Sequence, residues 1–521
     1  MSLLKNVGTI GGLTLASRIA GMAREMIFSR VLGANAITDA WFQAFIIPNV
    51  FRRLFAEGAF SAAFVPMFSK RLQGEGGIEE ARSFSADVLS VFLPILIALV
   101  AVFEIAMPGV VWLLAEKPID QQTFPVAVDF ARIMFPYILL VSLVTLFTGM
   151  LNSVSRFAPG ASFPIILNLV LIAALLIGER WIATGASIVQ VTYGIAWAVT
   201  GAGILQLAWL YYWVRAEGFE VKMRLPRLTP EVKRLSIIAL PAAIGGGAYQ
   251  INTLVQLYFL NQLENGAVSY MNYADRLNQL PLGIIGIALS TAILPALSKF
   301  VGSQDNDGAS RIQSDAIELA MLLTLPATIA LAICGVPFVT MIFEGGRFAI
   351  DDANQTGAVL SALVLGLPAY VLIKVLVPNF YARADTKTPV YTAFIALFVF
   401  VAYNIVFLEK YGVVGVALAS AVAAWINVSI LYAVLFIRNH YRASWRLAGR
   451  ILRQLIAAAA MGGALYFASD QLSEYYAAGI FARLFALAVL VGAAAIVYFT
   501  LAFLLGAIDR DRVTKLTRKS T

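Results

Sequence analysis

Charged residues that could bind a ligand fall within segments that are otherwise apolar enough to cross a membrane. The arginines are Arg18, Arg24, Arg52, Arg53 and Arg276, and the nearest carboxylates are Glu25, Asp39, Glu57 and Asp275. A charge at the bilayer centre costs about 2.5–3.5 kcal/mol on insertion scales, so such residues usually face a cavity or a partner. Because the arginines outnumber the carboxylates and a guanidinium fork matches phosphate geometry, the set favours a cavity for an anionic, phosphate-bearing ligand.

A second interpretation is that these charges form internal ion pairs that hold helices together. Arg53 and Glu57 are four residues apart, a spacing that places both on one helix face, and Arg276 directly follows Asp275. Pro48 removes a backbone hydrogen-bond donor from the helix that carries Arg53 and Glu57, which predicts a kink in that helix. The residue pattern alone leaves both interpretations open.

The composition predicts the elements that must position these residues. Of the 521 residues, 60% are hydrophobic and only 13% are charged, whereas soluble domains are nearer half apolar and a quarter charged. A spanning helix needs about 20 mostly apolar residues. We therefore expect an all-α polytopic membrane protein with about fourteen transmembrane helices, near residues 7–30, 38–68, 86–114, 124–151, 160–178, 186–214, 236–261, 270–298, 316–343, 356–381, 389–408, 413–437, 451–469 and 482–508.

Loop charges predict the orientation of these helices. Most lysines and arginines outside the helices lie in one alternate set of loops and in the C-terminal tail. The opposite loops hold only Lys117, Arg180, Arg347 and Lys410, with Arg30 and Arg483 near helix ends. Since cytoplasmic loops carry the excess of basic residues, we expect a multi-pass membrane protein with both termini in the cytoplasm.

Short matches between the two halves of the chain predict an internal repeat. The sequence before Lys70 resembles that before Lys299, Phe135-Pro136-Tyr137 resembles Leu367-Pro368-Ala369, and Ala158-Pro159 resembles Thr388-Pro389. Transporters built from parallel repeats bind substrate between the halves. We expect two pseudo-symmetric six-helix lobes, at residues 1–214 and 236–438, a basic linker at 215–235, and two extra helices with a basic tail at 439–521.

Several other kinds of function have few residues to support them. The single cysteine, Cys334, lies in an apolar run and predicts a buried packing residue, and the single histidine, His440, lacks neighbours at metal-ligand spacing. The net charge of +8 is spread over short loops, so no nucleic-acid partner is expected. No early segment resembles a cleaved signal peptide, and the first helix is expected to remain in the mature protein.

One long motif carries a resemblance to a known family. The run from Pro48 to Ser61, PNVFRRLFAEGAFS, followed by Ala63-Phe64-Val65-Pro66, resembles the signature of the MurJ/MviN lipid II flippases. The resemblance extends through Ser17 to Glu25, Thr38-Asp39-Ala40, Tyr273-Ala274-Asp275-Arg276 and Lys387-Thr388-Pro389, and covers essentially the whole chain.

The resemblance implies a fold of the multidrug/oligosaccharidyl-lipid/polysaccharide exporter superfamily. It further implies a flippase that carries undecaprenyl-diphosphate-linked disaccharide-pentapeptide, lipid II, from the inner to the outer leaflet by alternating access, for peptidoglycan synthesis. Substrate-binding positions of the family correspond to Arg18, Arg24, Arg52, Arg276, Asn49 and Ser269. We assign Asp39, Glu57, Asp275, Glu25 and Arg53 to gating or charge pairing.

The resemblance also bears on partners and on the source of energy. The helices near 451–469 and 482–508 resemble a family pair that forms a groove for the polyprenyl tail, although plain helix packing explains their small residues equally well. We expect lipid II and membrane lipid as partners, while cell-wall synthesis proteins as partners are not readable from sequence. No cofactor or metal is expected, and the membrane potential and a coupled cation remain alternative drivers.

Rival functions differ in the cavity that they require. A drug or cation antiporter of the same superfamily should have an acidic cavity. An O-antigen or capsule lipid flippase shares the diphosphate, and only the signature around Asn49 to Ser61 separates it from a lipid II flippase. A membrane glycosyltransferase would need carboxylate-rich outer loops, which are absent here. We therefore expect a transporter and not an enzyme or a scaffold.

Overall fold

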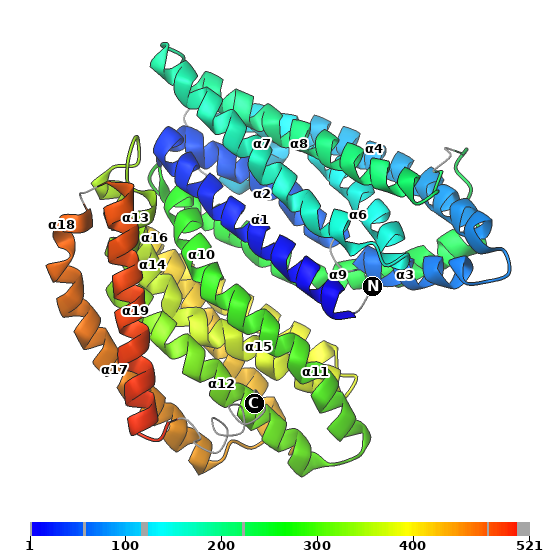
Figure 1. Ribbon diagram of the computed structural model, residues 1–521. Coiled ribbons are helices and arrows are strands. Elements are labelled where there is room, and N and C mark those ends of the chain that lie inside the picture. Colours follow the sequence, from blue (N-terminus) through cyan, green and yellow to red (C-terminus); the bar gives the residue numbers. More distant parts are fainter. Residues whose placement is uncertain (1–2, 56–58, 116–122, 221–223, 477–478, 508–521) are drawn as a thin grey trace. The chain divides into compact units, whose positions relative to one another are not determined.

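The computed structural model describes residues 3–55, 59–115, 123–220, 224–476 and 479–507 (Figure 1). Within these ranges the regular structure is helical, apart from an isolated antiparallel bridge between Gly345 and Phe348. Between its ends a helix pairs its backbone N–H and C=O groups within the same segment, which lipid requires of a spanning segment. The predicted all-α membrane fold is confirmed.

Ten helical stretches among the described residues are long and apolar enough to cross a membrane. One of them, α16 (Lys387–Ile437), covers both spans predicted near 389–408 and 413–437, and Gly412 at φ 52 interrupts its helical geometry between the two. Helices α1 (Leu3–Leu32), α2 (Ala36–Phe55) and α9 (Pro230–Leu260) are not among the ten. The total of fourteen spans therefore stays a prediction.

The chain divides into two compact units. The first comprises residues 1–269 with the turn Gly345–Phe348, and the second comprises 270–344 and 349–521. Besides α1, α2 and α9, the first unit contains α3 (Ala59–Leu72), α4 (Gly77–Ala115), α5 (Thr123–Met134), α6 (Tyr137–Ser153), α7 (Phe157–Ala183) and α8 (Ile188–Ala216).

In the first unit, α7 packs against both α1 and α8 (Figure 1). Helix α2 packs against α5. Phenylalanine rings build much of the core: Phe64 stacks on Phe60, Phe68 and Phe84 with centroids 5.4–5.7 Å apart. The apolar cluster around these rings includes Val232 and other residues of α9. Helix α9 therefore belongs to this unit through hydrophobic burial against α2, α3 and α4.

Helix α10 (Ala267–Pro281) begins in the first unit and continues into the second from Tyr270. The second unit further contains the π-helical η1 (Leu282–Gly286), α11 (Ile287–Gly302), α12 (Asn306–Ile333), α13 (Gly335–Phe343), α14 (Ile350–Leu363), the 3-10 turn η2 (Val364–Gly366), α15 (Leu367–Tyr381), α16, α17 (Trp445–Gln471), α18 (Ser473–Tyr476) and α19 (Ile480–Leu504). Helix α12 packs against α11, α15 and α17, and α17 packs against α19. Cys334 lies buried between α12 and α13, as predicted.

The division between units differs from the boundary expected for the repeat. We placed residues 236–260 in the second lobe, whereas α9 packs with the first unit. Sequence repeats report common ancestry of two halves, and a helix can pack against either half. The lobe boundaries at 214, 236 and 438 stay a prediction about the repeat.

Backbone geometry supports the repeat itself. Residues with a positive φ, the left-handed backbone conformation, occur at corresponding turns between helices in the two halves, 221 to 233 residues apart. The corresponding pairs are Gly33 and Gly266, Gly77 and Gln304, Ser155 and Ala384, Gly185 and Gly412, and Gly218 and Asn439. A left-handed residue is unfavourable for most side chains, so five such coincidences indicate a shared path of the chain.

Candidate functional site

The carboxylate of Asp39 caps the backbone where α10 begins. Its Oδ2 accepts the Gly266 N–H at 2.6 Å, and its Oδ1 accepts the Ser269 N–H at 2.8 Å and the Ser269 hydroxyl at 2.5 Å. The first N–H groups of a helix have no intrahelical partner and attract negative charge. Two residues predicted for different roles, Asp39 for gating and Ser269 for substrate binding, are thus joined directly.

The arginines of α1 differ in their surroundings. Arg24 donates to the carboxylate of Glu25, and both side chains are buried, at 7% and 2% exposed. Arg18 is half-buried, and no hydrogen bond or ion pair joins its side chain to another described residue. The carboxylate of Glu25 is therefore paired with Arg24. The N–H groups of the Arg18 side chain make no hydrogen bond to another described residue.

The predicted polar stripe of α2 is present beside Pro48. The side-chain amide of Asn49 donates to the Phe45 carbonyl at 2.8 Å, and its oxygen accepts Arg52 Nε at 3.1 Å. Proline cannot donate a backbone hydrogen bond, and Asn49 adds a side-chain bond at that turn. Asn49 thereby orients Arg52, while the side chain of Arg53 and the whole of Glu57 lie outside the described residues.

The remaining predicted residues lie on α10 in the second unit. Asp275 accepts a hydrogen bond from Gln279, one turn further along the helix. Arg276 is half-buried on the same helix. The structure brings together Asp39 with Ser269, Arg24 with Glu25, and Asn49 with Arg52. The arginines of α1 and α2 and Arg276 belong to separate units, and a shared cavity for them stays a proposal.

Sequence reasoning missed several partners of these residues. Asn168 of α7 donates to the Ser17 carbonyl at 3.1 Å and packs against Gly21, so it fixes α1 against α7 next to Arg18. Its signal was an amide inside an apolar helix. Gly266 contributes a backbone donor at φ +98, and its signal was a glycine one residue before a helix.

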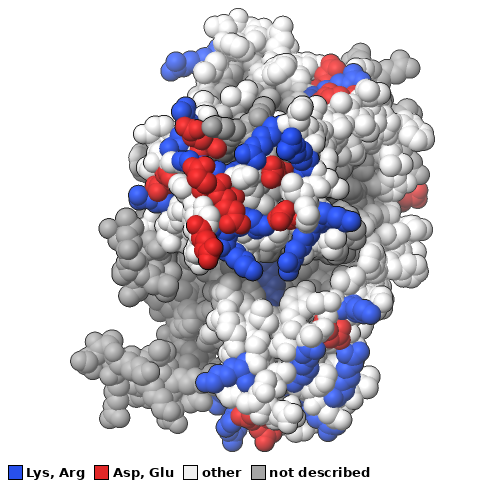
Figure 2. Space-filling view, turned by 90° about the vertical axis from the view of Figure 1, so that its right-hand side faces the viewer, with Lys and Arg blue, Asp and Glu red and all other residues white. Residues whose placement is uncertain are grey.

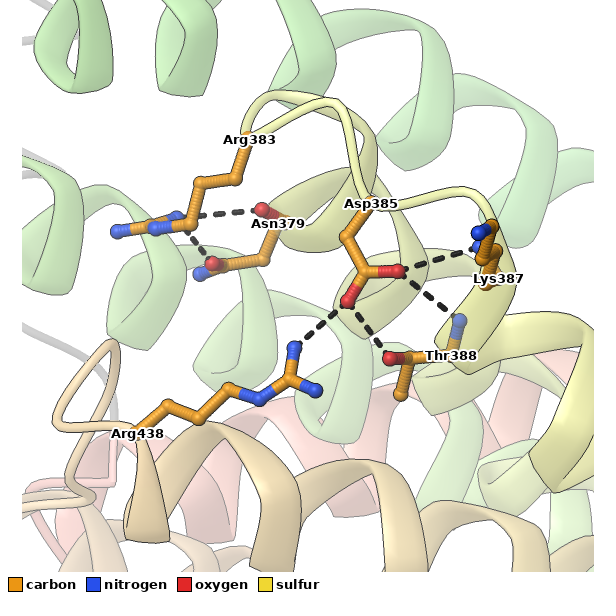
Figure 3. Close-up of polar contacts among 6 residues, drawn as sticks. All are labelled: Asn379, Arg383, Asp385, Lys387, Thr388 and Arg438. Atoms are coloured by element: carbon orange, nitrogen blue, oxygen red, sulfur yellow. Dashed lines mark hydrogen bonds and ion pairs between the residues drawn. The ribbon is translucent and has the colours of Figure 1, made fainter.

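A second polar cluster joins the α15–α16 turn to the end of α16 (Figure 3). Asp385 accepts the backbone N–H groups of Lys387 and Thr388 at 3.1 and 3.0 Å, the Thr388 hydroxyl at 2.6 Å and Arg438 Nη1 at 2.6 Å. These donors, led by the Thr388 hydroxyl, lower the pKa of Asp385 to about 2. The carboxylate is therefore ionised throughout the physiological pH range, and it accepts hydrogen bonds from the first backbone N–H groups of α16.

Neighbouring groups extend this cluster to α12 within the second unit. Arg383 donates to the backbone and side-chain oxygens of Asn379, and Asn379 donates to Gln313 Oε1 of α12 at 3.0 Å. Burial, followed by the charges of Arg383 and Arg438, lowers the pKa of His440. The imidazole of His440 is therefore neutral at pH 7. No group of three or more His, Cys, Asp or Glu side chains that could hold a metal ion occurs among the described residues.

Charged side chains gather on one face of the molecule, next to wide areas without charge (Figure 2). Near the ends of helices of the first unit, ion pairs join Arg82 with Glu79, Arg156 with Glu217 and Arg224 with Asp87. Exposed ion pairs of this kind contribute about 0–1 kcal/mol each. Their clustering at helix ends leaves long uncharged helix surfaces, as lipid requires.

Comparisons with known proteins give a consistent result. The family model described as "Lipid II flippase MurJ" matches residues 28–487. A Rhizobium meliloti (strain 1021) protein named "Probable lipid II flippase MurJ" is 41% identical over 523 residues, covering 100% of this chain and 97% of that protein. The Burkholderia cenocepacia protein "Lipid II flippase MurJ" is 34% identical over 474 residues, covering 88% of each chain.

Solved structures agree with these sequence matches. A structure of "Lipid II flippase MurJ, inward closed conformation" superimposes with a TM-score of 0.77 at 25% identity, covering 95% of this chain and 98% of that one. An inward-facing multidrug resistance MATE transporter of the MOP superfamily gives a TM-score of 0.68 at 15% identity, over 81% and 94% of the two chains, which shows a common fold. The chain, a multi-pass inner-membrane transporter, belongs to the lipid II flippase MurJ family.

Proposed function

We propose that this chain translocates lipid II, undecaprenyl-diphosphate-linked disaccharide-pentapeptide, from the inner to the outer leaflet by alternating access. The observation that carries the proposal is the family match over residues 28–487, together with relatives that align along their whole length. The half-buried or buried arginines of α1, α2 and α10 supply the chemistry that a diphosphate needs. A drug antiporter of the same superfamily would have little use for such cationic helices.

Within this function we assign the diphosphate to Arg18, Arg24, Arg52 and Arg276. A guanidinium stays charged when desolvated and binds phosphate oxygens through two parallel N–H groups. Asn49 supports this assignment, because it holds Arg52 Nε at 3.1 Å and so fixes the orientation of one fork. Ser269 takes part through its hydroxyl when the Asp39 contact is released.

The carboxylates serve a different purpose in this proposal. Glu25, in contact with Arg24, neutralises a buried charge while substrate is absent, and diphosphate competes for the same guanidinium. Removing either partner from a buried pair leaves an uncompensated charge, which costs about 3–5 kcal/mol. We assign the same pairing role to Asp275, Glu57 and Arg53, and assign gating to Asp39.

We also propose that both termini lie in the cytoplasm, on the side of the α6–α7 and α15–α16 turns. Lipid II enters from that side, where its synthesis ends, and leaves on the opposite side. No resident cofactor takes part in this scheme. The driving force comes from the membrane potential or from a coupled cation.

The test is depletion of this protein in its own bacterium, with rescue by wild type or by the double variant Arg24→Ala, Arg276→Ala. A membrane-impermeant hydrolase that cleaves the precursor from outside reports its leaflet. Each lost charge-assisted hydrogen bond costs about 1.5–3 kcal/mol, so two together should slow transport about 100-fold or more. Arg227→Ala, at an exposed arginine outside the helices, is the matched control.

Wild type and Arg227→Ala should restore outward precursor, whereas the double variant, present at equal amounts in the membrane, should leave it inside. Normal outward precursor during depletion would refute the function. Rescue by the double variant would refute only the site assignment.

A further inference from the structure

The turn between α13 and α14 belongs to one unit, while the helices on either side of it belong to the other. Residues Gly345–Phe348 are part of the first unit, whereas α13 and α14 are part of the second. Within the second unit α13 packs against α19, and α14 packs against α16. Any movement of α13 and α14 relative to α1 must therefore carry these four residues along or pull them off the first unit.

Close backbone contacts fasten the turn to the end of α1. The Arg347 N–H donates to the Arg30 carbonyl at 2.8 Å. A Cβ at Gly346 would lie 2.3 Å from the Arg30 carbonyl oxygen, and a Cβ at Gly33 would lie 2.7 Å from the Arg347 carbonyl oxygen. A side chain at either position would clash, so the two glycines allow the two backbones to meet.

The turn keeps its shape through its own hydrogen bonds. Gly345 N–H donates to the Phe348 carbonyl at 3.0 Å, and Phe348 N–H donates to the Gly345 carbonyl at 3.1 Å. Neither bond involves α1. The turn can therefore separate from α1 and return to it without losing these bonds.

The chain on both sides of the turn is anchored in the second unit. Glu344, directly before the turn, pairs with Arg483 of α19 at 2.6 Å, and Arg483 also donates to the Glu344 carbonyl at 2.8 Å. After the turn, Asp352 accepts the Ala349 N–H at 2.9 Å at the start of α14. Because both flanks are held in this way, movement of α13 and α14 acts directly on residues 345–348.

The corner of the first unit that receives the turn also carries Asp39. This corner, residues 30–39, runs from the last turn of α1 to the first turn of α2. Asp39 accepts the Gly266 N–H at 2.6 Å and the Ser269 N–H at 2.8 Å. Since α1 begins in the cytoplasm in the proposed orientation, the corner lies on the outward side. Two segments from the second half of the chain thus hold one corner.

We propose that residues 345–348 form a latch, which stays on the α1–α2 corner while the outward side is closed and separates from it when the substrate leaves. This inference rests on the proposed function and deepens it by naming a device of the alternating-access cycle. The latch and the Asp39 cap release together, because both hold the same corner.

The experiment fixes the latch with a covalent link and measures outward transport in the depleted bacterium. Arg30→Cys with Arg347→Cys, in a Cys334→Ser background, places two thiols where a backbone hydrogen bond already joins the residues. A short membrane-permeant bis-methanethiosulfonate links the thiols, and a reducing agent removes the link. The unlinked variant should rescue transport, the linked variant should not, and reduction should restore it.

The matched control carries Arg156→Cys and Glu217→Cys in the same background. These residues form an ion pair at 2.7 Å within the first unit, between parts of the chain that need not separate. The same reagent should leave transport by this control, and by Cys334→Ser alone, unchanged. Full transport by the linked Arg30–Arg347 variant would overturn the latch, and so would an equal loss in the linked control.

A second measurement uses the wild-type chain in nanodiscs, followed by hydrogen exchange with and without lipid II. Lipid II should speed exchange at the Arg347 N–H about twofold to tenfold, as expected for loss of one backbone hydrogen bond. The Gly308 N–H, which Asp305 holds at 2.7 Å at the start of α12, should keep its rate. Unchanged exchange at Arg347 while native mass spectrometry shows bound lipid II would overturn the latch alone. A chain that binds no lipid II would overturn the proposed function.

Discussion

Substitution of Asp39 by asparagine should release the start of α10. The carboxylate accepts three hydrogen bonds, from the Gly266 N–H, the Ser269 N–H and the Ser269 hydroxyl, at 2.5–2.8 Å. In Asp39→Asn one oxygen is replaced by an NH2 group, which would face a donor. At least one charge-assisted bond is lost, at about 1.5–3 kcal/mol, with about 0.3–1 kcal/mol of helix-dipole attraction.

A cost of about 2–4 kcal/mol corresponds to a change of about 30-fold to 1000-fold in the equilibrium between capped and released states. Ser269→Ala removes only the hydroxyl contact and should have a smaller effect. Asp305→Asn is the matched control, because Asp305 caps the start of α12 through the Gly308 N–H at 2.7 Å. It should lower thermal stability without affecting transport.

The assay replaces the single cysteine of the chain and introduces a new cysteine as the reporter. In a Cys334→Ser background, Ala267→Cys places a reporter at a position that is 1% exposed. Asp39→Asn should raise the rate at which maleimide labels this cysteine by about 30-fold or more, as expected from the lost hydrogen bonds, and should impair outward transport. Unchanged labelling with full transport, or an equal effect of Asp305→Asn, would refute the gating role of the cap.

Two further substitutions test features outside the proposed cavity. Gly346→Ala should lower the melting temperature more than Gly77→Ala: both have φ above 50°, but a Cβ at Gly346 would lie 2.3 Å from the Arg30 carbonyl oxygen, whereas Gly77 faces open space. Equal losses in thermal unfolding would contradict the steric argument. Asp385→Asn should destabilise the chain by about 1–2 kcal/mol through loss of the helix cap and the exposed pair with Arg438. Because the pKa of Asp385 is lowered to about 2, this contribution is present above the ordinary pKa of 3.8 and is lost only as pH falls through about 2. Melting temperatures at pH 4 to 8 should thus show a constant difference from wild type, and a difference that vanishes below pH 6 would refute the assignment.

The sequence was sufficient for the fold class, because helix length and hydropathy are local properties. It also named most residues that carry polar contacts in α1, α2 and α10. It did not show that Asp39 meets Ser269, since these residues are 230 positions apart and only the tertiary structure brings them together. Helical periodicity predicts which face a residue occupies but gives no information on the partner of that face.

Local sequence patterns also could not predict how the chain divides into two units. We predicted that helix α9 begins the second half of the repeat, and its apolar residues gave no indication of which unit they would pack against. In the structure Val232 and Leu235 join the phenylalanine core of the first unit. The free energy of burial depends on the apolar area removed from water and not on position in the sequence. A duplicated chain can therefore exchange a helix between units without changing its composition.

The two halves of the repeat also differ in a way that a sequence comparison conceals. In the first unit, Arg156 of the α6–α7 turn pairs with Glu217 at the end of α8, at 2.7 Å. In the second unit, Asp385 of the α15–α16 turn pairs with Arg438 at the end of α16, at 2.6 Å. The backbone positions correspond, but the signs of the charges are exchanged. The attraction within an ion pair is the same when the two charges are exchanged, whereas a sequence alignment scores each exchanged position as a mismatch. The repeat has therefore kept the contact between helix ends at this turn, although the residues that make the contact differ.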